Sequence, residues 1–110
     1  GQIGMCAFDL DNNKVYFGVN GVWTNSGNPG GNANGFTIAD PDDTELGFYF
    51  PSTSDRSLNR SYVYSFNFGN GFFGTTAITS AGSNGNGSLF EYDVPSGYYA
   101  LNTKNINTYG

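Results

Sequence analysis

The sequence predicts an all-β fold, specifically an antiparallel β-sandwich with almost no helix. Charged residues make up only 12% of the chain, whereas aromatic residues make up 17% and glycines number 17. A helical bundle would need more alanine, leucine, glutamate and lysine. Short alternating strands joined by tight turns suit this composition. At 110 residues the chain forms one domain at most, so residues 1–110 are assigned to one domain segment.

The N-terminal part predicts a hairpin. Ile3–Leu10 is apolar on both faces, which is typical of a covered central strand, and Cys6 is expected to be buried within it. A polar turn leads to Lys14–Val19, which alternates with the period of a half-buried strand. Its faces are Val15, Phe17 and Val19 on one side, and Lys14, Tyr16 and Gly18 on the other. Asn20-Gly21 then predicts a tight turn with positive φ at both positions.

Six further strands are expected along the rest of the chain. They lie at Gly35–Ile38, Leu46–Phe50, Tyr62–Phe68, Thr75–Thr79, Leu89–Val94 and Tyr98–Leu101. Tyr62–Phe68 places its aromatic residues on one face, which favours core packing or an inter-sheet layer. The apolar faces predict four core residues, namely Phe17, Phe48, Phe66 and Phe68.

Four segments, taken in order, resemble the SPRY domain. They are the hairpin Cys6–Trp23, the run Leu46–Pro51, the triplet Asn67-Phe68-Gly69 and the segment Val94–Asn102. The resemblance implies a concanavalin A-like jelly-roll sandwich. Asn20–Pro29 and Ala100–Ile106 look like SPRY-like segments of bacteriophage and marine-phage proteins.

The resemblance also implies that part of the domain is missing. SPRY domains carry earlier strands ahead of the cysteine strand, whereas this sequence starts at Gly1. We therefore expect residues 1–110 to be the C-terminal portion of the domain, with the N-terminal strands missing from this chain. Such a half sandwich would expose strand edges and half of a core, so it is not expected to fold alone.

Charge and residue types argue against several functions. The net charge is −5, and the four cations are scattered, which disfavours binding to nucleic acid. An acidic surface is repelled by anionic membranes, and no apolar run is long enough for a transmembrane span. The chain has no histidine, so it cannot hold a Ser-His-Asp or Cys-His set. We expect no enzyme activity.

Two groups of acidic residues are candidate sites. The loop Asp40–Glu45 could offer oxygens to Ca²⁺, but it lacks the Asp-x-Asp-x-Asp-Gly pattern. Glu91 and Asp93 share one face of a predicted strand, where a polar outer face explains them without a glycosidase centre. No metal and no cofactor is therefore assigned, and Ca²⁺ binding by the acidic loop stays open.

Ligand binding is better supported, at the polar loop that follows Trp23. Exposed tryptophan stacks on sugars or receives a peptide, and asparagine amides both donate and accept hydrogen bonds. The candidate ligand-binding residues are Trp23, Asn25, Ser26, Asn28, Asn32 and Asn34. The alternative interpretation is that Trp23 fills the core and the asparagines only form turns.

Taken with these observations, the resemblance implies a non-enzymatic SPRY-like module of a phage or phage-like virion structural protein. Its expected role is adhesion to a host-surface glycan or protein, or decoration of the particle, in contact with other virion subunits. It would be located in the virion, assembled in the host cytoplasm. The alternatives are a purely structural packing subunit, a cellular, cytoplasmic SPRY adaptor that grips a peptide, and a carbohydrate-active enzyme.

Overall fold

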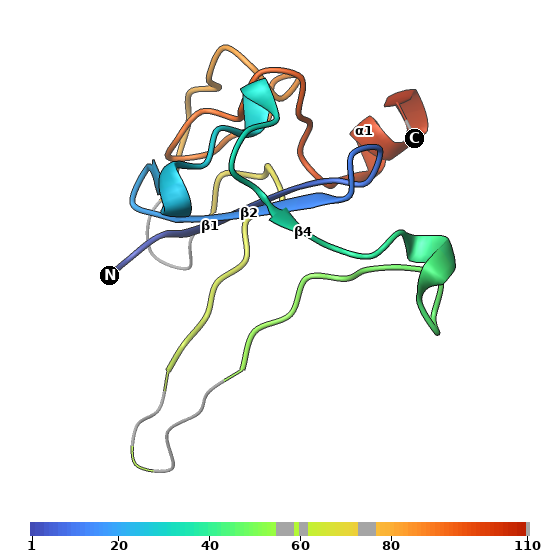
Figure 1. The fold of residues 1–110 in the computed structure, drawn as a ribbon. Coiled ribbons are helices and arrows are strands. Elements are labelled where there is room, and N and C mark those ends of the chain that lie inside the picture. The colour runs from blue at the N-terminus through green and yellow to red at the C-terminus, as the bar shows by residue number, and fades with distance from the viewer. Residues whose placement is uncertain (55–58, 60–61, 73–76, 110) are drawn as a thin grey trace.

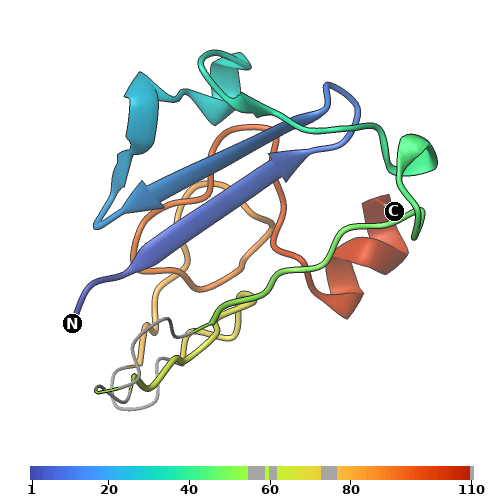
Figure 2. The same cartoon turned by 60° about the horizontal axis from the view of Figure 1, so that its bottom comes forward.

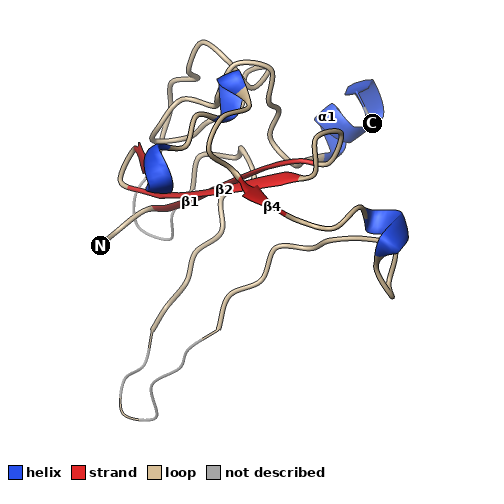
Figure 3. Ribbon diagram, in the orientation of Figure 1, coloured by secondary structure: helices blue, strands red, loops and turns tan. Residues whose placement is uncertain are grey.

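The computed structural model describes residues 1–54, 59, 62–72 and 77–109. Within them the chain forms a four-stranded antiparallel sheet and one short helix, α1 (Thr103–Tyr109) (Figures 1 and 3). Long loops connect these elements and make up most of the remaining chain (Figure 3). The expectation of a strand-based domain is confirmed at this level.

The sheet is built around β2 (Lys14–Val19). Along one edge β2 pairs with β1 (Gly4–Asp9), and along the other it pairs with β3 (Val22–Trp23) and β4 (Phe36–Thr37). All three pairings are antiparallel. The first two strands and β4 lie where the sequence predicts them, whereas β3 was not predicted.

The Asn20-Gly21 turn has the predicted geometry. Asn20 has φ 50° and Gly21 has φ 83°, which asparagine and glycine tolerate better than other residues. The Asn20 backbone N–H donates to the Ile3 carbonyl at 2.9 Å, and the Ile3 N–H donates to Asn20 Oδ1 at 2.8 Å. The turn residue therefore also ties down the first residues of the hairpin.

The inner face of the sheet packs around Tyr16. This side chain is only 2% exposed and lies close to the buried Ala7. Segments 24–35 and 80–100 form a layer of loops over this face (Figure 1). Tyr98 is part of that layer: burial, with Asp9 and Tyr16 nearby, raises the pKa of Tyr98 to about 12. The core is thus small and lies between the sheet and these loops.

The outer face of the sheet is open. Phe17 is 50% exposed and Cys6, its partner across the strands, is exposed as well. Phe17 and Phe36 contact each other on this face, with ring centroids 6.2 Å apart. The predicted burial of Phe17 and Cys6 is therefore wrong, because no described segment covers the face to which they belong.

Most of the later predicted strands are wrong. Residues 46–54 and 62–67 run away from the body as two extended arms, on the side of the sheet opposite the loop layer (Figure 1). The side chains of these arms alternate between two faces, but neither arm pairs with another segment as a strand. The contact between them is a side-chain hydrogen bond, in which the Tyr64 hydroxyl donates to the Ser54 carbonyl at 3.3 Å. Their aromatic side chains are exposed, so the predicted core residues Phe48 and Phe66 are not buried, and Phe68, which follows the second arm, is 41% exposed.

Residues beyond 68 form isolated bridges in place of the expected strands. Leu89 bridges to Asn70, and Tyr99 bridges to Gly85, both in parallel. Ala77 bridges to Phe72, while Thr75 and Thr76 of the predicted strand Thr75–Thr79 lie outside the described residues. Single bridges leave loops in place of a second sheet, so the structure describes one sheet and the predicted sandwich stays a prediction.

Helix α1 closes the chain and was not predicted. Asn102 caps it, since its Oδ1 accepts the Asn105 N–H at 3.0 Å. The buried Asn105 side chain donates to the Ala100 carbonyl at 2.9 Å, which fixes the helix against the preceding segment. Across the described ranges, no helix has the length and apolar character that a membrane span requires.

Candidate functional site

Trp23 is held at the rim of the core by the strand that carries it. It pairs with Gly18 in the β2–β3 register and therefore lies on the inner face with Tyr16. The two rings meet edge to face, with centroids 6.5 Å apart and planes at 75°. The side chain is half-buried. Trp23 is thus a packed residue that still presents part of its indole, so both interpretations of it hold in part.

The loop after Trp23 folds into two short turns of 3₁₀ helix, η1 (Thr24–Ser26) and η2 (Pro29–Gly31). Four of its residues have positive φ: Asn25, Ser26, Asn32 and Asn34. Asparagine enters this region more readily than other non-glycine residues. The backbone conformation of the loop therefore explains why asparagine is frequent in it.

Three of the loop amides are used within the loop or on the core. Asn25 Nδ2 donates to the Asn34 carbonyl at 3.4 Å, and Asn34 Nδ2 donates to the Ser26 carbonyl at 3.1 Å, which closes the loop on itself. Asn32 Oδ1 accepts the hydroxyl proton of Tyr16 at 3.2 Å. These contacts favour the interpretation of Asn25, Ser26, Asn32 and Asn34 as structural residues.

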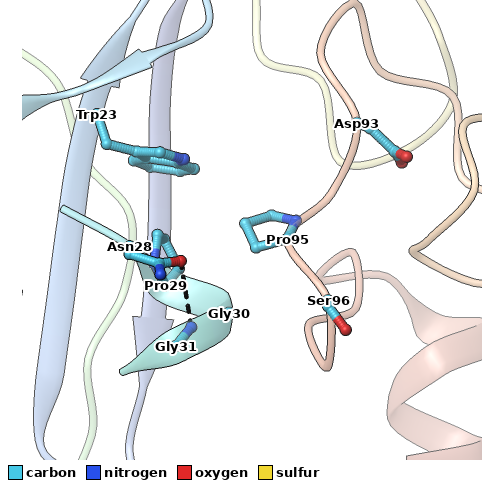
Figure 4. A pocket seen from close by; sticks show the side chains of 8 residues that line it. All are labelled: Trp23, Asn28, Pro29, Gly30, Gly31, Asp93, Pro95 and Ser96. Carbon is cyan, nitrogen blue, oxygen red and sulfur yellow. Dashed lines mark hydrogen bonds between the residues drawn. The ribbon is translucent and has the colours of Figure 1, made fainter. Parts of the chain in front are cut away.

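A hollow of about 400 Å³ opens between Trp23 and the segment 93–96. Its lining residues are Trp23, Asn28, Pro29, Gly30, Gly31, Asp93, Pro95 and Ser96. Figure 4 shows Trp23 and Asn28 on one wall, facing Pro95 on the other. The walls meet at Gly30, where an added Cβ would be 3.4 Å from the Ser96 backbone nitrogen. The hollow is open to solvent, so it would contact one side of a ligand and would not enclose it.

Two polar groups of this hollow are free to bind. Asn28 Oδ1 accepts the Gly31 N–H at 3.2 Å, which caps η2, but its Nδ2 has no partner in the described part of the chain. The Ser96 hydroxyl is equally without a partner among those residues. An indole, an amide donor and a hydroxyl together suit a sugar or a short polar peptide.

Asp93 lines the hollow but is already occupied. Its carboxylate accepts backbone N–H groups of Ser83 at 2.8 Å, Asn84 at 3.1 Å and Val94 at 2.9 Å. These hydrogen bonds, led by the one from Asn84, hold the pKa of Asp93 below its usual value. Figure 4 shows the carboxylate turned away from Trp23. Asp93 therefore lines the hollow, but its carboxylate is already hydrogen-bonded within the protein and is not offered to a ligand.

The structure brings together only two of the six predicted site residues, Trp23 and Asn28. The other four lie in the same loop but do not line the hollow. Sequence reasoning missed Asp93, Pro95 and Ser96, which come from a distant loop. The turn signal Pro95-Ser96-Gly97 was visible, but nothing local indicated that it would meet the Trp23 loop.

The acidic loop forms a turn. Asp40 Oδ1 accepts the Asp42 N–H at 3.0 Å and caps η3 (Pro41–Asp43). Over residues 1–54, 59, 62–72 and 77–109, no three His, Cys, Asp or Glu side chains come together as a metal site. Glu91 and Asp93 lie in a loop, so the predicted strand face that would hold both does not form.

Comparison with known proteins adds no relative. No family model matches the chain, and neither does any curated protein or solved structure. The functional argument therefore depends on the residues of this chain.

Proposed function

We propose that this chain is a non-enzymatic, SPRY-like recognition module of a phage or phage-like virion structural protein. On this proposal the hollow beside Trp23 contacts a host-surface glycan or protein, and the sheet is one layer of a concanavalin A-like sandwich. The resemblance of the four ordered segments to SPRY domains supports the fold, and the resemblance of Asn20–Pro29 and Ala100–Ile106 to SPRY-like segments of phage proteins supports the phage context.

One observation carries the recognition role. The indole of Trp23 is fixed by Tyr16 and faces an open hollow in which Asn28 Nδ2 and the Ser96 hydroxyl have no partner among the described residues. A preorganised aromatic ring limits the entropy lost on binding, and two free polar groups orient the ligand.

The test uses Asn28→Asp on an array of bacterial surface polysaccharides. This change keeps an oxygen for the Gly31 N–H and replaces the free donor by an acceptor. One lost hydrogen bond predicts binding weakened by about 5-fold or more. The matched control is Asn70→Asp, since Asn70 Oδ1 accepts a similar hydrogen bond from the Phe72 N–H at 3.3 Å and does not line the hollow. Equal binding by both variants, or no binding by the unmodified chain, would overturn glycan recognition at this hollow.

A purely structural packing role is the second candidate. The exposed aromatic side chains of the two arms and of the outer sheet face favour it, because monomeric proteins rarely leave so much apolar surface uncovered. On this view the module contacts other subunits of a particle, and the Trp23 hollow stays empty of ligand on the array.

A further inference from the structure

The outer face of the sheet is more apolar than the inner face. Paired residues share a face, so the register assigns every position. The outer positions are Gly4, Cys6, Phe8, Val15, Phe17, Val19, Val22 and Phe36, with no charged or polar side chain other than the thiol. The inner face, in contrast, includes Asp9, Lys14 and Thr37.

In a sheet with one face in water, the solvated face is the polar one, whereas here the exposed face is the apolar one. Antiparallel sheets with one solvated face alternate apolar residues inside with polar residues outside. Here Phe8, Phe17, Phe36, Val19 and Val22 are 38–71% exposed on the apolar side. Figure 2 turns this face forward and shows β1 and β2 without a covering layer. The residues are those of a core face, and the described chain does not bury them.

The exposed area approaches that of a stable interface. An aromatic side chain offers about 150–250 Å², so the three phenylalanines of this face present roughly 300 Å². The arms leave the body on the same side of the sheet (Figure 1), and four phenylalanines in or next to them are 41–65% exposed. Together the seven rings present roughly 700 Å², close to the about 800 Å² per partner of a standard interface.

We propose that this face, the outer positions of β1, β2, β3 and β4, together with the described arm residues 46–54 and 62–68 on the same side of the sheet, is a self-association interface occupied by the same surface of a second copy of the chain. Two such sheets pack about 10 Å apart as the layers of a sandwich. The pairing needs no charge to be buried, because the acidic residues of the described sheet lie on its inner face or in its turns. A two-fold axis makes the surface its own complement. This inference does not depend on ligand binding at Trp23.

Phe17→Asp tests the proposal in the 110-residue chain. Sedimentation velocity at about 100 μM and about 1 μM brackets a micromolar dissociation constant. The unmodified chain is expected to be a dimer at the higher concentration, and Phe17→Asp a monomer at both. The matched control is Ile106→Asp, because Ile106 is 53% exposed on α1, outside the face, and should keep the dimer. A monomeric unmodified chain, or a dimer that survives Phe17→Asp, would overturn the proposal.

A second measurement needs no variant. Cys6 is the only cysteine of the chain, and it lies on the same outer face as Phe17, its direct partner in the β1–β2 register. Its reaction with a maleimide should be several-fold slower at the higher concentration than at the lower, about 7-fold for a dissociation constant of about 1 μM, since a packed partner excludes the reagent and the monomer fraction falls as the concentration rises. A rate that does not change with protein concentration would contradict the interface, even if folding of Phe17→Asp were impaired.

Discussion

Tyr16 and Phe17 are neighbours with opposite roles. Tyr16 is buried, contacts Trp23 and donates to Asn32, whereas Phe17 points to the open face. Alternation alone made the Phe17 face look like the core, because it is the more apolar of the two. The side chain that fills the core is a tyrosine flanked by Lys14 and Gly18 on its own face, and the sequence offered no local sign of the loops that cover it.

The difference in burial between Tyr16 and Phe17 predicts that truncating them to alanine lowers the free energy of unfolding by different amounts. Tyr16→Ala should lower the free energy of unfolding by about 3–5 kcal/mol, the range for a buried aromatic residue. Phe17→Ala should lower it by less than about 1 kcal/mol, as for exposed positions. Urea unfolding at a protein concentration too low for self-association measures both. Equal losses, or a larger loss for Phe17→Ala, would show that the faces are assigned wrongly.

Asp93 predicts a pH dependence of stability. Its pKa in the folded chain lies below its ordinary value of 3.8, because backbone N–H groups bind the charged form. The stabilisation is therefore present above about pH 4 and is lost as the pH falls through the folded pKa. Melting temperatures measured from neutral to acidic pH should drop more steeply below about pH 4 for the unmodified chain than for Asp93→Asn.

Glu91→Gln is the matched control for Asp93→Asn. The Glu91 carboxylate makes no hydrogen bond within the described part of the chain, and the residue is exposed. Its variant should follow the melting curve of the unmodified chain at each pH. If Asp93→Asn did so too, the hydrogen bonds to Ser83, Asn84 and Val94 would not contribute to stability.

At the scale of elements, local signals succeeded where neighbours in sequence are neighbours in space. β1 and β2 form a hairpin, and Asn20-Gly21 adopts the turn that these residues favour. The strand predictions for the two arms are wrong because a strand also needs a hydrogen-bonded partner. A partner that is distant in sequence leaves no local signal. The two-residue strand β3 is too short to show alternation, although it sets the position of Trp23.

Helix α1 was missed for a different reason. Its seven residues include two further asparagines and two threonines, which are poor helix formers, so propensity predicts a loop. The cap at Asn102 was a usable signal, but the stabilising contact is tertiary. Asn105 is buried, donates to the Ala100 carbonyl and accepts from Asn86 Nδ2 at 3.1 Å.

Asn105 therefore should hold the helix in place. Asn105→Ala leaves the Ala100 carbonyl and the Asn86 amide without this partner, which costs about 1–3 kcal/mol. We expect faster amide exchange over residues 103–109 and a lower urea midpoint. Asn107→Ala, at an exposed position of the same helix, should change neither. Slow exchange in both variants would mean that α1 is held by other contacts.

At the scale of the whole molecule, the sheet divides the chain into two surfaces. The loop layer on one face contains the Trp23 hollow, and the open face on the other side carries apolar side chains (Figures 1 and 2). From the sequence, Trp23 and Asn28 could be predicted as site residues because an aromatic beside a polar loop is a local pattern. Pro95 and Ser96 could not, since only the fold brings residues 93–96 to that loop.

The intrinsic fluorescence of Trp23 tests the proposed function most directly. Trp23 is the only tryptophan of the chain, so its emission reports on this hollow alone. Titration with an oligosaccharide that binds on the array should shift or quench the emission, and Ser96→Ala and Asn28→Asp should each move the midpoint to higher concentration. An oligosaccharide that binds by calorimetry, without changing the Trp23 emission and with equal affinity for both variants, would contradict the account.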